Sequence, residues 1–265
     1  MSRTGHPLKP YISPDIFANA PRPVVVIAND YPDGFLIPSH RHRRAQLLYP
    51  STGVITVTTR DGSWIVPPLR AVWIPAGIHH EVRAVGRVSM RSVNITARAA
   101  RSLPRKCCAV GVSPLLRELI LRAAGLPLLY EEHSGAGRMM RLVLDEIHAL
   151  PVLPLHLPAP EHPRLKIICD AIVARPDLEH TIEDWARRIG ASPRTVARLF
   201  RSHTGMSFSA WRQQARLLEA LKRLAAGEPV TSVALDLGYA SPSAFISMFR
   251  RAFGNTPGRY FGAAA

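Results

Sequence analysis

The chain has 265 residues, enough for one large domain or for two ordinary domains that each bury a core. Its three cysteines form neither a disulfide framework nor a zinc-binding spacing. The sequence shows no leader-like start and no run of about 18 apolar residues, so we expect a cytoplasmic protein without a membrane partner. The formal net charge of +15 indicates a polyanionic partner such as nucleic acid.

Residues 20–100 predict β-structure. The β-branched run VITVTT at 54–59 leads through a turn, RDG, into the strand-like SWIVPP. Further short strand-like runs follow at 71–77 (AVWIPAG) and 88–96 (VSMRSVNIT). Short strands at such close spacing are typical of an all-β barrel or sandwich.

Two amphipathic helices are predicted after the β-structure. Residues 113–124 begin with a Ser–Pro pair suited to an N-cap and first turn, and then place leucine and isoleucine on one face. Residues 137–149 repeat this periodicity. The apolar faces serve either as core packing against the β-structure or as the seam of a homodimer, with Leu119 and Leu142 near that seam. The sequence leaves both alternatives open.

A proline-rich segment at 151–163 holds five of the 24 prolines in the chain. Proline fixes the backbone and removes a donor, so we expect a semi-rigid linker here. Beyond this segment every predicted element is helical. Thr181 and Asp184 have the spacing of a capping box at the start of the first short helix pair.

The helical region contains an internal repeat with an offset of 49 residues. Segments 192–205 and 241–254 share a Ser–Pro start, a Phe–Arg pair and a final glycine, and each follows a short helix that ends in glycine. A longer helix, 207–226, joins the two copies. The repeat predicts a duplicated helix-turn-helix, because a helix presented by a tight turn can enter a major groove about 12 Å wide. A plain helical bundle would not require matched caps in both copies.

Residues 165–262 resemble the DNA-binding domain of the AraC/XylS family of transcriptional regulators, most specifically in the run DLGYASPSAFISMFRRAFGNTPGRY. The resemblance implies two recognition helices in successive major grooves, with centres about 34 Å apart. It assigns DNA contacts to two sets of residues: Arg194, Thr195, Ala197, Arg198 and Arg201 in the first copy, and Ser243, Ala244, Ser247, Arg250 and Arg251 in the second. Ser247 stands where the family usually has a long polar or basic residue. We therefore expect weaker base reading by the second helix, with Arg250 and Arg251 on phosphates.

The N-terminal half resembles the cupin sensor domains of the same family. His40, His42, Gln46 and Gly53 match the opening cupin motif, and Pro75, Gly77 and His80 match the second motif. Two positions depart from the pattern, since Gln46 replaces a carboxylate and Ala84 replaces an asparagine. The resemblance implies that His40, His42, Gln46 and His80 converge as the floor of an effector pocket. Such a set holds a divalent metal (Fe, Zn or Ni), binds an acidic effector or lines a polar pocket with water, and these alternatives stay open.

Together these features predict an α+β protein. Residues 1–105 would form a cupin-like β-barrel sensor, 106–150 a helical dimerisation segment, 151–162 the linker and 163–265 an all-α double helix-turn-helix domain. The expected function is a sequence-specific transcriptional regulator, not an enzyme, that controls nearby genes in response to a small molecule. Its expected partners are operator DNA, the effector, a second copy of the chain and RNA polymerase.

Within the family this combination resembles the nitroimidazole-efflux repressor subgroup, which suggests a transporter or efflux gene as target. Two other function classes stay in view. One is a cupin metalloenzyme, an oxygenase or isomerase, with an appended helical domain. The other is a non-specific nucleoid protein, suggested by the charge alone.

Overall fold

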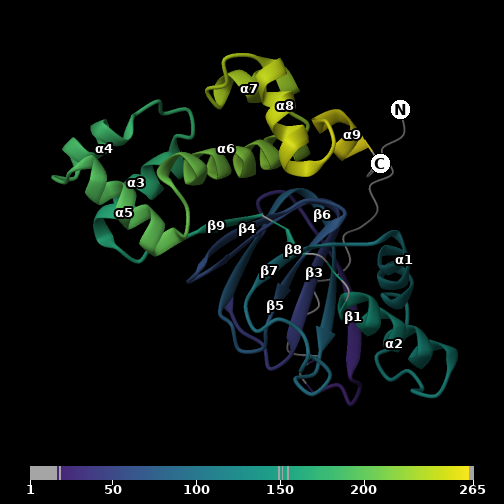
Figure 1. Ribbon diagram of the computed structural model, residues 1–265. Helices are drawn as coiled ribbons and strands as arrows, with labels where there is room; N and C mark the ends of the chain where they lie inside the picture. The colour runs from purple at the N-terminus through teal and green to yellow at the C-terminus, as the bar shows by residue number, and fades with distance from the viewer. Residues whose placement is uncertain (1–16, 18, 149, 151, 154, 263–265) are drawn as a thin grey trace. The chain divides into compact units, whose positions relative to one another are not determined.

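A computed structural model describes the protein at residues 17, 19–148, 150, 152–153 and 155–262. Contacts divide the chain into two compact units, with strands dominating the first and helices the second (Figure 1). The first unit contains the described residues up to Val57 and the segment Val66–Leu155; the second contains Thr58–Ile65 and the described residues from His156 onward. None of the helices described is long and apolar enough to cross a membrane.

Within the described residues, nine strands form one sheet. Their order is β1-β6-β3-β5-β7-β8, while β2 pairs with β6 and β4 pairs with both β3 and β9. The pairing of β1 with β6 is antiparallel and regular, from Val24 opposite Ile95 to Tyr31 opposite Val88. The strand bounds are β1 Val24–Tyr31, β2 Leu36–His40, β3 Ala45–Thr59, β4 Gly62–Val66, β5 Arg70–Ile74, β6 His80–Ile95, β7 Cys108–Gly111, β8 Val152–Leu153 and β9 His156–Pro158.

The predicted β-structure is confirmed, with longer strands than the short runs suggested. The run at 54–59 is the second half of β3, and the run at 88–96 lies almost wholly within the 16-residue strand β6. Both strands bury apolar side chains deeply, including Leu47, Val93 and Ile95. The sheet therefore presents a continuous apolar surface that has to be covered.

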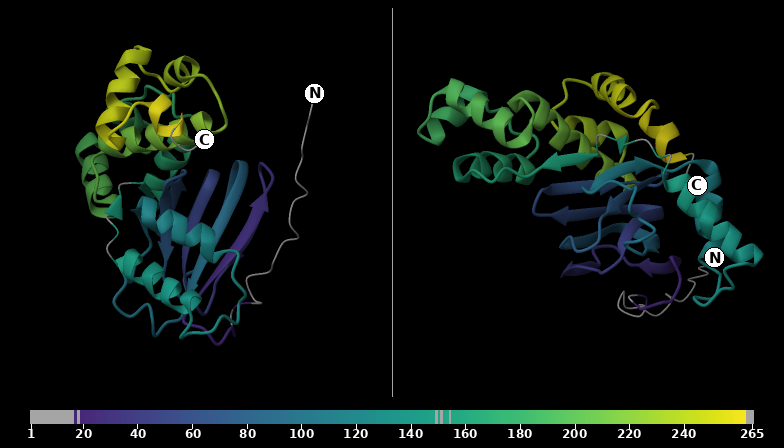
Figure 2. Two further views of the ribbon diagram at one scale, coloured as in Figure 1. Left: turned by 90° about the vertical axis from the view of Figure 1, so that its right-hand side faces the viewer. Right: turned by 60° about the horizontal axis from the view of Figure 1, so that its bottom comes forward.

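Helices α1 (Pro114–Ala123) and α2 (Gly135–His148) cover part of this surface (Figure 2). Ser113 caps α1 by accepting a hydrogen bond from the Leu116 amide at 3.0 Å, and its hydroxyl donates to Glu146 of α2 at 2.8 Å. Both helices turn apolar residues into the core shared with the sheet. These are Leu116, Ile120 and Ala123 from α1, and Met140, Val143 and Ile147 from α2.

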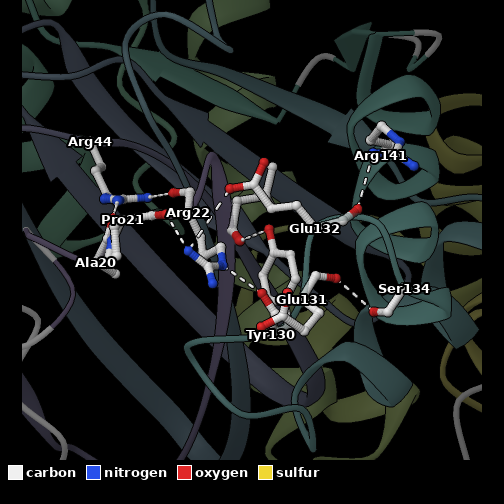
Figure 3. A network of polar contacts seen from close by, with 10 residues as sticks. Ala20, Pro21, Arg22, Arg44, Tyr130, Glu131, Glu132, Ser134 and Arg141 are labelled. Atoms are coloured by element: carbon white, nitrogen blue, oxygen red, sulfur yellow. Dashed lines mark hydrogen bonds and ion pairs between the residues drawn. The ribbon is translucent and has the colours of Figure 1, made fainter.

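A network of arginine side chains ties the loop between α1 and α2 to the start of β1 (Figure 3). The Arg22 Nε donates to the Tyr130 carbonyl at 2.5 Å, and the Tyr130 hydroxyl donates to the Val24 carbonyl at 2.9 Å. The guanidinium of Arg44, a buried residue, donates to the Arg22 carbonyl at 3.0 Å. This network and the core contacts described above hold α1 and α2 against the sheet. Their inner faces are core packing, so only their outer faces are left for a dimer seam.

The proline-rich segment differs from the expected linker, because part of it is paired. Strand β8 lies on β7, and β9 lies on β4 with Gly62 opposite Pro158 and Trp64 opposite His156. Pro158 is tolerated there because β9 pairs with β4 alone and so is an edge strand. Proline argues against a central strand and not against an edge.

The second unit is built from seven described helices around an aromatic core. Trp185, Val196, Phe200 and Trp211 are almost completely buried, as the sequence predicted, and so are the equivalent Phe245 and Phe249 of the second copy. The helices are α3 Pro163–Ala174, α4 Ile182–Arg188, α5 Pro193–Thr204, α6 Phe208–Ala225, α7 Val230–Asp236, α8 Pro242–Phe253 and α9 Pro257–Gly262.

The two helix-turn-helix copies share their local chemistry as well as their sequence. The Ser192 hydroxyl caps α5 and the Ser241 hydroxyl caps α8, each accepting from the amide three residues on. The turn before each cap contains a glycine with positive φ, 63° at Gly190 and 73° at Gly238. A side chain would be strained in this left-handed conformation, so glycine is what lets the second helix of each pair follow so closely.

Candidate functional site

Helix α5 turns one face into the core and leaves the opposite face in solvent. Val196, Leu199 and Phe200 point inward, whereas Ala197 and Arg198 face outward. Thr195 is half-buried and its hydroxyl is hydrogen-bonded to that of Ser192 at 2.9 Å, so it lies at the capped end of the helix. The other predicted contact residues of this copy are all exposed: Arg194, Ala197, Arg198 and Arg201.

Helix α8 repeats this division. Phe245 and Phe249 are buried, and the five predicted contact residues are all exposed: Ser243, Ala244, Ser247, Arg250 and Arg251. The exposed face is small and neutral near the N-terminus of α8 and basic in its last turn. The first copy, by contrast, carries arginine from its first turn onward. The chemistry of the two faces thus agrees with stronger base reading by α5.

The arginines of these two faces have no electrostatic partner in the part of the chain that the structure describes. The guanidinium groups of Arg194, Arg198, Arg201, Arg250 and Arg251 make no ion pair and no hydrogen bond there. Other arginines of the same unit are engaged; Arg187, for example, is paired with Asp184. Five unpaired guanidinium groups on α5 and α8 can bind phosphates or base edges without breaking existing contacts.

Helix α6 holds both copies. Near its start the Arg212 guanidinium donates to the His180 carbonyl at 3.1 Å, beside the first copy. Near its end Arg223 donates to Glu228 at 2.8 Å and to Asp236 of α7 at 2.6 Å. These hydrogen bonds raise the pKa of Arg223, which therefore stays charged. One 18-residue helix anchored at both ends fixes the separation of α5 and α8.

A second candidate site lies in the first unit, where three histidine rings meet. His40 ends β2 and His80 begins β6 as its paired residue, and His42 lies in the connection to β3. The ring centroids are 4.4–5.4 Å apart, and one ring nitrogen from each histidine lies within 4.8 Å of the others. Gln46, at the start of β3, is buried beside them and lines the same cavity. The structure thus brings the four predicted residues together.

Two of the three histidines, His42 and His80, are neutral near pH 7. Burial lowers the pKa of His42 to about 4, with a smaller effect from His40, and burial also lowers the pKa of His80 to about 4. The Nδ1 atoms of His40 and His80 lie 2.7 and 2.9 Å from the carbonyls of Pro38 and Ile78. A carbonyl only accepts, so Nδ1 carries a proton in both rings, and in the neutral ring of His80 Nε2 keeps its lone pair.

Sequence reasoning missed the polar residues Asn29 and Ser92, which line the cavity. It also missed Asn94, which contacts Gln46. Its Oδ1 accepts a hydrogen bond from Gln46 Nε2 at 2.9 Å, and its Nδ2 donates to the Ser92 carbonyl at 3.1 Å. Ala84, which occupies the asparagine position of the cupin motif, does not line the cavity. The available signal was the pair of polar residues, Ser92 and Asn94, at alternate positions of the strand-like run 88–96, because such residues share one face of a strand.

Two cavities of the first unit differ in size and lining. The histidine cavity has a volume of about 30 Å³. A larger cavity of about 270 Å³ lies between the sheet and the end of α2, where Leu47, Trp73, Val110 and Ile147 form apolar walls. Ser102 and His148 add a polar edge and are hydrogen-bonded to each other at 2.6 Å.

Each of the two units is similar to a known protein domain. Residues 23–147 match the AraC-like ligand binding domain, and residues 185–263 match a helix-turn-helix domain. The chain is 37% identical over 228 residues to the HTH-type transcriptional regulator NimR of Escherichia coli (strain K12), which covers 86% of this chain and 83% of that protein. It is 34% identical over 132 residues to the HTH-type transcriptional regulator RipA of Corynebacterium glutamicum, which covers 50% of this chain and 38% of RipA.

Solved structures include two similar chains. ToxT from Vibrio cholerae has 10% identity and a TM-score of 0.39, covering 91% of this chain and 98% of its own. The DNA-binding domain of AdpA, solved in complex with a target DNA, has 32% identity and a TM-score of 0.36, covering 38% of this chain and 91% of its own.

The extent of the match to NimR decides the assignment. An identity of 37% extends over 86% of this chain and 83% of NimR. Both relatives named above are transcriptional regulators, the class of protein expected from the sequence. The chain belongs to the AraC family of transcriptional regulators, with an N-terminal ligand-binding domain followed by a helix-turn-helix DNA-binding domain.

Proposed function

We propose that this regulator binds its operator as a homodimer through α5 and α8 and alters transcription of nearby genes when its sensor domain is occupied. The observation that carries the proposal is the matched pair of capped helices whose outward faces hold five unpaired arginines. A transporter or efflux gene as target rests on the subgroup resemblance. A protein of this kind acts where chromosomal DNA and RNA polymerase are, in the cytoplasm.

The residues divide by role. On α5, Arg194, Ala197 and Arg198 face base edges, while Thr195 and Arg201 face the backbone. On α8, Ser243, Ala244 and Ser247 lie in the groove with fewer hydrogen-bonding atoms to offer. Arg250 and Arg251, in the last turn, bind phosphates, which orient the helix and carry no sequence information.

The dimer seam is assigned to the outer faces of α1 and α2. Leu115 and Leu142 are 49% and 41% exposed there, although the inner faces of the same helices are packed into the core. Exposed leucines on adjoining helices form the kind of apolar surface that a second copy covers. Leu119 is only half-exposed and packs against the core, so it is a peripheral member of this seam.

The sensing site is proposed at His40, His42, Gln46 and His80. Its cavity of about 30 Å³ admits an ion-sized signal. An organic effector finds more room in the cavity of about 270 Å³ beside α2, which approaches the roughly 300 Å³ at the lower end of ligand pockets. We therefore place an organic effector in the larger cavity, with Trp73 and Ile147 as apolar walls and Ser102 at its polar edge.

Selection of genomic fragments by the purified protein, followed by footprinting, tests the function. We expect a few enriched fragments, each with a short protected site that contains two adjacent major grooves. Uniform coating of all DNA would instead identify a nucleoid protein. Failure to retain any DNA would refute the proposal and revive the metalloenzyme alternative.

A further inference from the structure

Helix α6 runs between the two helix-turn-helix copies (Figure 1), and polar side chains in its first half contact segments of both. Arg212 donates to the His180 carbonyl at 3.1 Å, in the connection between α3 and α4 that leads into the first copy. Gln213 donates to the Tyr239 hydroxyl at 3.3 Å, in the turn between α7 and α8 of the second copy. Each of these two side chains thus joins α6 to one copy.

Arg216, about one turn further along α6, contacts both segments. Its Nε donates to the Pro176 carbonyl at 2.7 Å, and its Nη2 donates to the Leu178 carbonyl at 3.4 Å. The same guanidinium lies against Gly238, where an added Cβ atom would come within 3.1 Å of Nη2. Arg216 is half-buried, so these contacts are partly shielded from water. One side chain therefore bridges the connection before α4 and the turn before α8.

The two bridged segments also touch each other directly. A Cβ atom at Gly238 would lie 3.4 Å from the Asp177 carbonyl oxygen, so the backbones meet at van der Waals distance. The next residue, Tyr239, packs edge-to-face on Phe245 of α8 at a centroid distance of 5.2 Å. A displacement of the first segment is therefore passed through Gly238 and Tyr239 to α8.

The composition of α8 gives this bridge a consequence for DNA binding. The exposed residues Ser243, Ala244 and Ser247 offer few hydrogen-bonding atoms, whereas α5 carries arginine from its first turn. A set of weak contacts adds to affinity mainly when the helix is already held in its binding orientation, because ordering it on binding costs conformational entropy. The contribution of α8 therefore depends on what fixes it relative to α5.

We propose that Arg216 is a positioning residue for operator recognition, which holds α5 and α8 in one relative placement by bridging Pro176, Leu178 and Gly238. This placement lets α8 add to operator affinity although its own face is small and neutral. It also restricts the operator to one spacing of the two grooves, since one inserted base pair moves the second groove by about 3.4 Å and turns it by about 35° around the duplex. The inference rests on the proposed DNA contacts of α5 and α8, but the placement itself exists without DNA.

The placement is tested first in the absence of DNA. Spin labels at Ala197 of α5 and Ser247 of α8 report the distance between the two helices by double electron–electron resonance. They are attached to inserted p-acetylphenylalanine, because the chain has three native cysteines, and the labelled full-length protein is diluted with unlabelled protein. We expect a narrow distance distribution in the otherwise unaltered protein and a broader one in Arg216→Ala. Equal widths would overturn the inference, whether or not the protein binds DNA.

DNA affinity is then measured on two duplexes, one half-site of the operator obtained by selection and the same half-site shortened so that it ends before the groove of α8. Arg216→Ala should lower the affinity for the whole half-site about tenfold or more, because one hydrogen bond from a charged group corresponds to at least a decade in an equilibrium constant. The affinity for the shortened duplex should stay within about twofold, since α5 keeps its own contacts. Equal losses on both duplexes would show that Arg216 only stabilises the domain.

Matched controls lie on the same helix. Arg212→Ala removes a contact with the first copy, and Gln213→Ala removes a contact with the second, but neither side chain bridges the two. Both variants should keep the narrow distance distribution and should leave the ratio of the two affinities within about twofold of its original value. A change in either control as large as that in Arg216→Ala would assign the placement to α6 as a whole and overturn the role of Arg216.

Two further outcomes keep the result interpretable. Should Arg216→Ala fail to fold, the unaltered protein still decides, because selection from a library with varied spacing between the two groove sequences must return a single spacing. Several spacings of equal affinity would overturn the fixed placement. Broadening in Arg216→Ala without any selected DNA would remove the proposed DNA contacts and leave the positioning role, whereas selected DNA without broadening would do the reverse.

Discussion

Replacement of Arg198 by alanine is the sharpest test of how α5 reads DNA. Arg198 is exposed, its guanidinium has no partner among the described residues, and it lies on the face opposite Val196 and Phe200. Its removal should therefore change the free energy of unfolding by less than about 0.5 kcal/mol, as for most surface substitutions. If Arg198→Ala lowers DNA affinity while the stability of the protein is unchanged, the loss reports a direct contact between Arg198 and DNA.

The expected size of that effect follows from the chemistry of the contact. An arginine on a base edge contributes about 1–3 kcal/mol of discrimination, which corresponds to a roughly 5- to 150-fold loss of operator affinity at about 1.4 kcal/mol per decade. Ser247, the counterpart on α8, has a single hydroxyl. Ser247→Ala should cost about 0.5–1.5 kcal/mol, the net value of an ordinary hydrogen bond.

Equilibrium titrations of the operator and of a random duplex, each at several salt concentrations, measure these losses. Arg198→Ala should weaken operator binding more than random binding and leave the salt dependence unchanged. Arg251→Ala, which removes a phosphate contact, should weaken both DNAs alike and reduce the slope of log K against log salt by about 0.9. Equal losses on both DNAs for Arg198→Ala would refute the orientation assigned to α5.

Three other outcomes are expected. Leu142→Asp should give a folded monomer in analytical ultracentrifugation, whereas Leu116→Asp, at a buried position of the same helix pair, should unfold the first unit; a Leu142→Asp dimer would exclude the seam. Phe249→Ala, at a fully buried position, should cost about 3–5 kcal/mol in urea unfolding, and a loss below about 1 kcal/mol would show that the second copy is loosely packed. Hydrogen bonds from Thr181 lower the pKa of Asp184, so its contribution to stability is present above the usual carboxylate pKa and is lost as the pH falls through the lowered value. The stability difference from Asp184→Asn should therefore shrink in acid, and a difference that is the same at pH 7 and pH 2 would contradict the cap.

The helical repeat was predictable because its determinants are local. Serine caps, first-turn prolines and turn glycines act within a few residues of themselves, and α5 and α8 each begin immediately after the predicted cap. The aromatic core positions followed from the same periodicity. Helices α3 and α9 were not individually predicted.

The histidine site was predictable only in part. Four residues were found through their motif spacing, but Asn94 was not, because its contact with Gln46 joins positions 48 residues apart. The pairings of β8 with β7 and of β9 with β4 also escaped prediction, because they too join positions far apart in the sequence. Proline content reports on the backbone of one strand and says nothing about which partner strand lies beside it. Similarly, the periodicity of α1 and α2 marks an apolar face without showing what covers it.

The second unit is discontinuous in sequence, and this affects how the chain can be divided for experiments. Its helices begin at Pro163, yet the unit also contains β9 and the β-hairpin segment Thr58–Ile65. The Trp211 indole donates to the Pro158 carbonyl at 3.0 Å, and Leu157 packs against the same aromatic core. A fragment cut at the start of α3 would leave that indole N–H without its acceptor and uncover part of the core. Truncations meant to isolate the DNA-binding half should therefore start at or before His156, and even these would lack the hairpin strand that pairs with β9.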